Sequence, residues 1–211
     1  MEKIILIGAG GHSKSVVDSL DKDQYKVVGF LDENKTGTHL GLPIMGKCVS
    51  DIENYLTYKY FVAIGDVSAR KMWFEKLKEL QLDVINIIDK TAYVSPTAKM
   101  GIGNFIGKFA VINADSVIGN NNIINTRALI EHECTVGSHT HISTNSVING
   151  NVTVEDGVFF GSCAVCNGQL KIGRNAVIGS GSVVINDIEP CTVNVGVPAR
   201  AVKRRQQYDE N

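Results

Sequence analysis

A six-residue repeat of aliphatic side chains runs without interruption from Val94 to Val184 and constrains the fold more than any other feature. Thirteen of its sixteen positions are Val or Ile, and the other three are Met100, Phe160 and Cys166. Val and Ile make up 46 of the 211 residues, so a random set of sixteen would hold only three or four. A fixed hexad is typical of a parallel β-helix, in which each repeat supplies one side of a coil.

Two further regularities fit a three-sided coil of about 18 residues. The position two before each aliphatic residue is small or slender, as at Ala110 and Ser116, which suits a tight corner. The position one after it is often Gly or Asn, as at Gly107 and Asn113. We expect this second position to take the positive φ of the bend. About five such coils, stacked edge to edge, would bury one continuous core.

Residues 1–88 follow a different pattern, in which strand and helix signals alternate. Such alternation predicts a parallel sheet covered by helices. We therefore predict two domains, a Rossmann-like α/β domain over residues 1–88 and an all-β β-helix with a short C-terminal tail over 89–211. The expected elements are strands over 4–7, 25–32, 61–65 and 84–88, a helix burying Val16, Val17 and Leu20, and a helix over 67–80 burying Met72, Leu77 and Leu80 with its Lys, Glu and Arg side chains outside.

Composition excludes several classes of function. The net charge of −1 gives no sign of a nucleic-acid or electrostatic membrane partner, and no apolar run approaches the ~20 residues that span a bilayer. The first residues resemble a buried strand rather than a signal peptide. Five cysteines without framework spacing favour a reducing cytoplasm. Cys163 and Cys166 form a C-x-x-C, but Cys166 lies on the hexad, so we expect a packed thiol rather than a metal or redox pair.

The segment around His132 carries the densest group of reactive side chains. His132 comes two residues after a hexad position, where an outward side chain is expected, and Glu131 and Glu133 flank it. An imidazole ordinarily titrates near pH 6.5, which suits a base at neutral pH. A carboxylate on its far nitrogen would fix the tautomer and stabilise the imidazolium. The plainer alternative is a surface histidine in a charged turn.

The first strand ends in Gly8-x-Gly10-x-x-Ser13, a partial dinucleotide fingerprint with serine in place of the third glycine. Free N–H groups and the helix dipole at this point could bind a phosphate. Asp32 closes the second strand and could meet a ribose or base, although turn capping explains Asp32 and Asp66 equally well. NAD is not expected, because the domain is short and no redox machinery follows it.

These motifs, together with the ending Gly196–Arg200, resemble the hexapeptide-repeat acyltransferases along nearly the whole chain. The similarity is to the sugar acetyltransferases of the sialic acid O-acetyltransferase, bacillosamine-pathway UDP-4-amino-sugar N-acetyltransferase and GDP-perosamine N-acetyltransferase type. The resemblance implies a left-handed parallel β-helix. It also implies a homotrimer with active sites between subunits, and acetyl-CoA as co-substrate without a metal.

The resemblance further implies roles for individual residues. His132 would be the base, supported by Glu133. The residues implied in binding the nucleotide sugar are Gly8, Gly10, Gly11, His12, Asp32, Gly65, Asp66 and Asn125. Those implied in binding acetyl-CoA are His141, Gly150, Gly161, Ser162, Gly179 and Ser180. Because His132 and His141 are nine residues apart, half of one coil, they should face different sides of the prism, and a working site should take residues from two chains.

The predicted function is acetyl-CoA-dependent acetylation of the amine of a nucleotide-linked amino sugar, of the UDP-4-amino-4,6-dideoxy type, for bacterial surface glycan biosynthesis in the cytoplasm. One alternative is O-acetylation of sialic acid, with the same fold and base. Another is a non-catalytic scaffold that binds a sugar nucleotide.

A zinc carbonic anhydrase on the same fold is a rival with three histidine ligands. That family places two histidines five residues apart, whereas the gaps here are seven and two, at His132, His139 and His141. We expect His139 to be a solvated turn residue. Residues 203–205 are basic and could meet the 3′-phosphate of coenzyme A, although a solvated basic tail is the simpler expectation.

Overall fold

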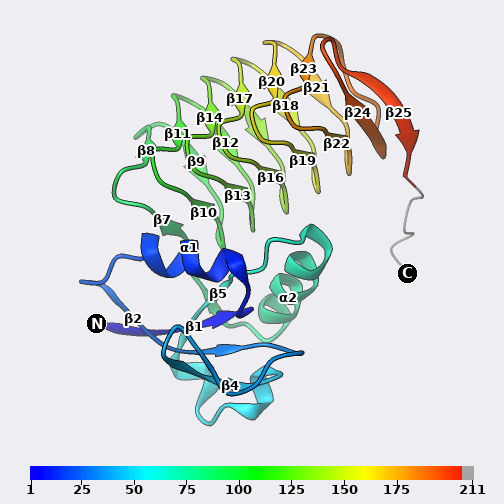
Figure 1. The fold of residues 1–211 in the computed structure, drawn as a ribbon. Helices are drawn as coiled ribbons and strands as arrows, with labels where there is room; N and C mark the ends of the chain where they lie inside the picture. Colours follow the sequence, from blue (N-terminus) through cyan, green and yellow to red (C-terminus); the bar gives the residue numbers. More distant parts are fainter. Residues whose placement is uncertain (206–211) are drawn as a thin grey trace.

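The computed structural model of the protein describes residues 1–205 and shows an α/β domain beside a long three-sided β-helix (Figure 1). The elements of the α/β domain are β1 (Glu2–Ile7), α1 (Gly11–Ser19), β2 (Tyr25–Leu31), β3 (Thr38–His39), β4 (Leu42–Gly46), the 3-10 turns η1 (Val49–Asp51) and η2 (Tyr55–Thr57), β5 (Lys59–Val62), α2 (Val67–Glu79) and β6 (Asp83–Val84). The β3–β4 hairpin and both 3-10 turns lie in a segment for which the sequence predicts no element.

The sheet of the α/β domain has the strand order β3-β4-β2-β1-β5-β6. All neighbours run parallel except the β3–β4 pair. The central strand β1 places Leu6 opposite Phe30 on one side and Phe61 on the other. Helix α1 connects β1 to β2, and helix α2 connects β5 to β6. Parallel strands connected through helices in this way confirm the predicted Rossmann-like domain.

The two faces of this sheet bury separate clusters. One face packs on α1 through Val16. The other packs on α2, whose buried side chains include Trp73, Phe74 and Leu77. The predicted inner face of this helix is therefore wrong in part, because Met72 is 51% exposed and Leu80 40% exposed. Trp73 and Phe74, which directly follow Met72, fill the core instead.

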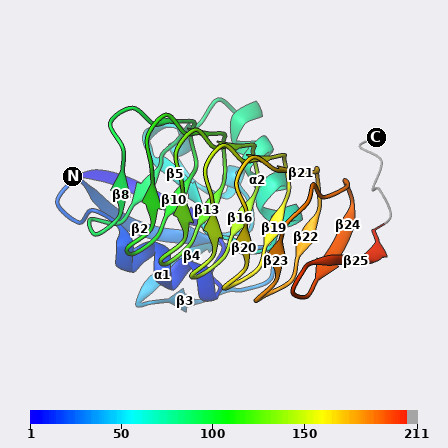
Figure 2. The ribbon, with the colours of Figure 1, turned by 90° about the horizontal axis from the view of Figure 1, so that it is seen from above.

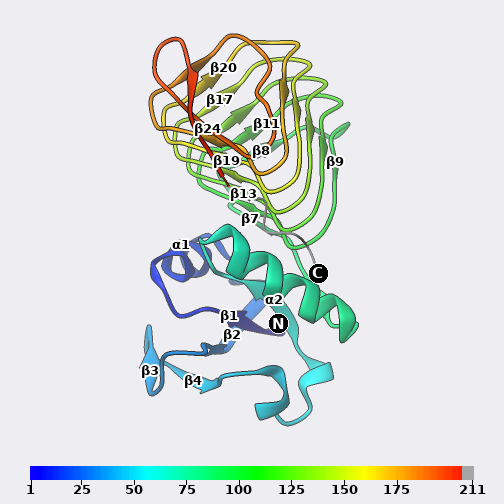
Figure 3. The ribbon, with the colours of Figure 1, turned by 90° about the vertical axis from the view of Figure 1, so that its right-hand side faces the viewer.

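The β-helix consists of three sheets whose strands run parallel except for the last, β25, and they are seen from above in Figure 2 and nearly end-on in Figure 3. The domain-facing sheet holds β7 (Ile87–Ile88), β10 (Phe105–Ile106), β13 (Ile123–Ile124), β16 (His141–Ile142), β19 (Phe159–Phe160), β22 (Val177–Ile178), β24 (Thr192–Val195) and β25 (Arg200–Arg204). The apolar sheet holds β8 (Tyr93–Val94), β11 (Val111–Ile112), β14 (Leu129–Ile130), β17 (Val147–Ile148), β20 (Val165–Cys166) and β23 (Val183–Val184). The polar sheet holds β9 (Lys99–Met100), β12 (Val117–Ile118), β15 (Thr135–Val136), β18 (Thr153–Val154) and β21 (Lys171–Ile172).

The hexad residue is the second residue of each two-residue strand from β8 to β23, and it points inward. From Ile106 to Val184 every hexad position is nearly or fully buried in one continuous cluster. Each strand pairs in parallel with the strand one coil later, as Phe105 does with Ile123. These observations confirm the three-sided coil and the left-handed β-helix fold class.

The corners of the coil differ from the prediction. The positive φ angles fall three residues after the hexad position, at non-glycine residues such as Phe109 and Glu133, and not one residue after it. Glycine occurs directly after the hexad residue for a different reason, which is that successive coils pack closely at this point. A Cβ at Gly107 would lie 2.9 Å from the Thr126 nitrogen, and one at Gly161 would lie 2.6 Å from the Ser180 nitrogen.

The two domains share one hydrophobic interface. The predicted strand 84–88 is two strands, since β6 closes the α/β sheet while β7 already pairs with β10 of the β-helix. The outward residues Ile87, Phe105 and Ile123 are buried against the α/β sheet. Direct packing of this kind fixes how the domains sit, and it leaves the later strands of the domain-facing sheet uncovered (Figure 1).

The other two sheets present different surfaces. The outward residues of the apolar sheet are Tyr93, Val111, Leu129, Val147, Val165 and Val183. Those of the polar sheet are Lys99, Val117, Thr135, Thr153 and Lys171. No helix within residues 1–205 has the length and apolar character needed to cross a bilayer.

Candidate active site

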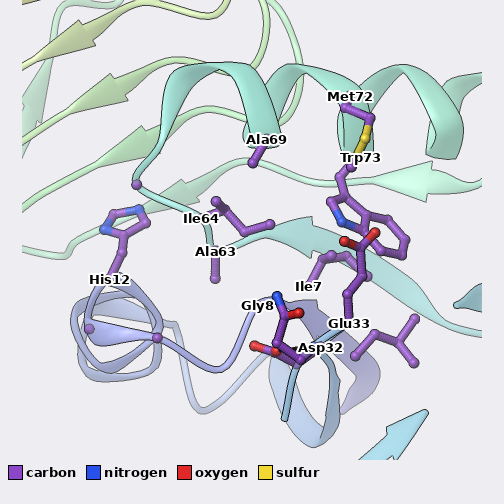
Figure 4. A pocket seen from close by; sticks show the side chains of 15 residues that line it. Ile7, Gly8, His12, Asp32, Glu33, Ala63, Ile64, Ala69, Met72 and Trp73 are labelled. Atoms are coloured by element: carbon purple, nitrogen blue, oxygen red, sulfur yellow. Dashed lines mark hydrogen bonds between the residues drawn. The ribbon is translucent and has the colours of Figure 1, made fainter. Parts of the chain in front are cut away.

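A pocket of about 260 Å³ opens at the carboxyl ends of β1, β2 and β5 (Figure 4). The glycine-rich loop forms one wall, with His12 beside it, and Trp73 and Met72 of α2 form another. At Gly10 and Gly11 a Cβ would meet nothing within 4 Å, so this main chain is open to a ligand. Gly8 has a φ of +97°, and a Cβ there would lie 2.7 Å from Ile64 Cγ1.

Asp32 and Asp66 organise the walls of this pocket. The Asp32 carboxylate accepts hydrogen bonds from the main-chain nitrogens of Ala9 at 2.8 Å and of Asn34 and Lys35 at 3.0 Å. Burial alone would raise the pKa of Asp32, but these N–H groups outweigh it and the pKa lies below its usual value. Asp66 caps α2 by accepting from the Ala69 nitrogen at 2.9 Å. Turn capping therefore accounts for both carboxylates.

His12 and His141 lie close together at the junction of the domains. The His12 ring packs edge-on against Phe105, with centroids 5.0 Å apart, and that of His141 packs against Phe159 at 5.2 Å. Burial, with the nearby His141 and Arg70, lowers the pKa of His12 to about 3. Burial and the Arg70 charge lower the pKa of His141 to about 4. Both rings are thus neutral at physiological pH.

The nitrogen atoms of these rings have few partners. Asn125 Nδ2 lies 3.5 Å from His141 Nε2. Within residues 1–205, buried His12 Nε2 and His141 Nδ1 have no hydrogen-bond partner. Gly65, at the rim of the pocket, lies next to His141 and partly opposes the lowering of its pKa. The pocket thus reaches one of the two neutral imidazoles, that of His12, and Gly65 at its rim lies next to the other.

His132 lies at a different place, on the corner between the apolar and polar sheets. Its side chain is 58% exposed, and Glu133 Oε2 lies 3.0 Å from its Nδ1. The ring rests on the next coil, where a Cβ at Gly150 would lie 2.7 Å from His132 Nε2. Gly168, one coil further on, also lies close, since a Cβ there would be 2.9 Å from the Gly150 oxygen. The His132 ring thus packs directly on the main chain of the next coil, and no side chain at Gly150 separates the two.

The structure divides the predicted site residues into two groups within one chain. His132, Glu133 and Gly150 lie at the corner between the apolar and polar sheets. The second group lies in or near the α/β domain and on the domain-facing sheet or the corner after it: Gly8, Gly10, Gly11, His12, Asp32, Gly65, Asp66, Asn125, His141, Gly161, Ser162, Gly179 and Ser180. This division follows the half-coil offset of His132 and His141, which places them on different sheet edges.

Among the predicted coenzyme A residues, Gly161 and Gly179 have a structural explanation in close coil stacking. Ser162 is half-buried and Ser180 exposed. Lys203 and Arg204 lie in β25, an exposed strand antiparallel to β24. The part of the predicted tail after residue 205 lies outside the described residues.

His139 contradicts its prediction. It is 8% exposed, its Nδ1 lies 2.8 Å from Asn121 Nδ2, and its Nε2 lies 3.2 Å from Glu75 Oε1. It therefore belongs to the domain interface rather than to solvent. In the part of the chain that the structure describes, no group of three His, Cys, Asp or Glu side chains could hold a metal ion. Cys166 is fully buried and burial raises the pKa of its thiol to about 12, as expected of a packed thiol.

Arg70 was expected outside with the other charged residues of α2, but it is 1% exposed. Nothing in the local pattern distinguishes it from its lysine neighbours. Its guanidinium contacts main-chain oxygens in both domains, including those of Gly65 at 3.0 Å and Thr140 at 3.1 Å. Glu33, Met72 and Trp73, which line the pocket, were also missed, because their positions depend on how α2 crosses the end of the sheet.

Known proteins match parts of this chain. The PglD N-terminal domain matches residues 3–77. A curated relative, the uncharacterized protein L142 of Acanthamoeba polyphaga mimivirus, is 37% identical over 103 residues, which are 47% of this chain. The chain spans about a fifth of that relative's length, since the match covers 20% of it.

Solved structures match the whole chain. A mutant perosamine N-acetyltransferase from Caulobacter crescentus, in complex with CoA and GDP-perosamine, is 32% identical with a TM-score of 0.92, over 96% of this chain and 98% of that one. The acetyltransferase domain of PglB from Neisseria gonorrhoeae, in complex with acetyl coenzyme A, is 29% identical with a TM-score of 0.89, over 95% and 99%. WeeI from Acinetobacter baumannii shares the fold at 24% identity and a TM-score of 0.85, over 96% and 100%.

The α/β domain joined to a β-helix, together with the match to these solved structures over nearly the whole chain, defines the class of enzyme. The chain belongs to the hexapeptide-repeat sugar acetyltransferases, which use acetyl-CoA as acyl donor.

Proposed function

We propose that the protein transfers the acetyl group of acetyl-CoA to the amine of a nucleotide-linked 4-amino-4,6-dideoxy sugar, with His132 as general base. The observation that carries this proposal is the geometry of His132. Its Nδ1 faces the Glu133 carboxylate at 3.0 Å, so the proton belongs on Nδ1 and the Nε2 lone pair is free. That nitrogen lies next to the Gly150 main chain, on a side chain that is 58% exposed.

The proposed reaction proceeds by attack of the amine on the thioester carbonyl. A C–N bond forms, the C–S bond breaks, and Nε2 of His132 takes the proton that the amine loses. The resulting imidazolium is stabilised by Glu133 and returns the proton to the departing thiolate of coenzyme A. The Gly150 main-chain N–H and the His141 imidazole would donate to the oxyanion that develops on the carbonyl oxygen.

These roles require residues from both groups, and one chain holds the groups apart. We therefore propose that each site forms between two subunits of a homotrimer. The apolar sheet supports this assembly, because its outward row of Val, Leu and Tyr is not covered within the chain and exposed apolar surface of this kind marks an interface. The polar sheet, with Lys and Thr outward, would face solvent.

The pocket at the glycine-rich loop is the proposed nucleotide site. α1 begins at Gly11 without a side-chain cap, so its first N–H groups are available to a diphosphate. Within residues 1–205 the Glu33 carboxylate makes no hydrogen bond or ion pair, and it lies beside Trp73 in the pocket (Figure 4). A carboxylate there would accept N–H groups of a base stacked near the indole.

The family resemblance implies a UDP-linked acceptor, and the Glu33 carboxylate makes a GDP-linked one the second candidate. Guanine offers two adjacent N–H donors to a carboxylate, whereas uracil offers one between two carbonyl oxygens. The Caulobacter relative binds GDP-perosamine. We further propose that the reaction takes place in the cytoplasm and serves the synthesis of a bacterial surface glycan.

An acceptor panel tests this function. We expect release of free thiol from acetyl-CoA when a UDP- or GDP-linked 4-amino-4,6-dideoxy sugar is added, and an acetylated amine in the product by mass spectrometry. The controls are the same sugars lacking the amine, and sialic acid. Thiol release with sialic acid alone would instead establish the O-acetyltransferase, and none with any acceptor would favour the scaffold.

Gly150→Ala should lower kcat about tenfold or more without unfolding the protein. The added Cβ would meet His132 Nε2 and Cε1 at 2.7 Å, so the ring must leave its place, and misplacement of a catalytic group by about 1 Å can cost a factor of 10². Steady-state kinetics with matched melting temperatures would measure this. Thr153→Ala, an exposed change on the polar sheet, is the control. Unchanged kcat in Gly150→Ala would show that the His132 position does not matter.

A further inference from the structure

Arg70 is the most deeply buried charged group of the molecule's domain junction. Its guanidinium donates to five of the main-chain oxygens around it within 3.3 Å: Asn121 from Nε at 3.1 Å, Ile64 and Gly65 from Nη1 at 3.3 and 3.0 Å, and His139 and Thr140 from Nη2, both at 3.1 Å. One side chain thus joins the pocket rim at Gly65 to two successive coils of the β-helix. The contact with the later coil includes the Thr140 oxygen, and Thr140 is the residue directly before His141.

No carboxylate contacts this guanidinium within the described part of the chain. Asp66 is the nearest acidic influence on it, but the Asp66 carboxylate is already used to cap α2. Burial lowers the pKa of Arg70 to about 10, which leaves it a cation at neutral pH. A buried cation satisfied only by carbonyl dipoles is costly compared with an apolar side chain in the same space. Packing alone therefore does not explain an arginine here.

We propose that Arg70 is a positioning residue of the acyl-transfer site, which holds Gly65 and the 139–140 main chain together and thereby sets the place and the neutral state of His141. This inference rests on the proposed function for its catalytic meaning. Its geometry stands on the hydrogen bonds alone. A planar guanidinium can address both segments at once because its donors point along fixed directions, and an ammonium group cannot.

The charge of Arg70 acts on His141 in the same direction as burial. The titratable or charged groups that face His141 are His12 from α1 and Arg70 from α2, and among residues 1–205 no acid opposes them. A neutral imidazole keeps one N–H, which can donate a hydrogen bond to a thioester oxygen, and one lone pair, which can accept a hydrogen bond. Arg70 would thus fix both the orientation of His141 and its protonation state.

The test compares Arg70→Met and Arg70→Lys in the full-length protein, with Lys78→Met on the exposed side of α2 as the matched control for loss of a cation. The first measurement is NMR titration of labelled histidines, with the His141 signal assigned through His141→Gln. We expect the pKa of His141 to rise by about one pH unit in Arg70→Met, as for loss of one nearby charge. It should stay near its wild-type value in Arg70→Lys and Lys78→Met.

The second measurement is kcat/KM for acetyl-CoA at matched folded fraction. We expect kcat/KM to fall by about tenfold or more in both Arg70 variants. Lysine keeps the positive charge but lacks the planar set of donors that contacts both main-chain segments. Lys78→Met should leave kcat/KM unchanged. A purely structural role would lower the melting temperature and leave both the His141 titration and kcat/KM at wild-type values, which would overturn the proposal. If Arg70→Met does not fold, wild-type kcat/KM in folded Arg70→Lys would overturn it equally. The titration needs no substrate, so an inactive wild-type protein would refute the proposed function without deciding the place of Arg70.

Discussion

Replacement of His132 by alanine should lower kcat by 10²–10⁴, roughly the contribution of a general base. The reason is the geometry of the His132–Glu133 pair, in which the carboxylate holds Nδ1 at 3.0 Å and leaves the lone pair of Nε2 to accept a proton. The side chain is 58% exposed, so its removal creates no cavity and should leave the fold intact. The measurement is single-turnover and steady-state release of thiol with the acceptor that the panel identifies.

Two comparisons make this result specific to proton transfer. His132→Gln keeps a polar side chain of similar reach without a base, so it should be as slow as the alanine variant. Thr135→Ala, exposed on the polar sheet three residues away, should behave as wild type. If kcat of His132→Ala were within a few-fold of the wild-type value, His132 would not be the general base.

The fold was predictable because its signal is repetitive and local. Each coil repeats the same pattern of inward aliphatic residues, so the six-residue period remains clear even though Met100 and Cys166 are neither Val nor Ile. The corner residues were misassigned for the opposite reason. Gly107 and Gly161 look like bend residues, yet their need for glycine comes from main-chain atoms one coil later. That contact is invisible until the coils are stacked.

The candidate site divides along the same line. His132 and Glu133 are neighbours in the sequence, so their pairing could be anticipated from a short motif. His12 and His141 meet only because the α/β domain packs on the domain-facing sheet, and no local pattern encodes that packing. Arg70 resembles an ordinary surface arginine of a helix. Its burial depends on carbonyl groups from three segments that fold from distant parts of the chain.

A mixture of two inactive variants should regain activity if each site is built from two chains. In a closed ring, a site is complete when one subunit supplies an intact His132 and its neighbour an intact His141. Random assembly of equal amounts of His132→Ala and His141→Ala subunits therefore yields complete sites at about a quarter of the interfaces, because the head-to-tail interfaces of a ring combine the two chains in all orders with equal probability. We expect up to about a quarter of wild-type activity from two preparations that are each nearly inactive.

This recovery distinguishes a shared site from one within a single chain more sharply than a dilution series does. If His132 and His141 of the same chain act together, every subunit in the mixture carries one defect and no assembly can restore a site. Co-expression of the two variants with different affinity tags, followed by tandem purification, isolates the mixed trimers, in which one of the three sites is complete, so the expected activity of this sample rises to about a third of wild type. His132→Ala combined with the double variant His132→Ala/His141→Ala is the control, since it lacks an intact base in every subunit. Recovery in the first mixture and not in the second would show that His132 of one subunit acts with His141 of the next. The apolar sheet, or another surface of the β-helix, would then have to bring the His132 corner of one subunit to the domain junction of its neighbour. Such an assembly would explain why a single chain holds the two groups apart.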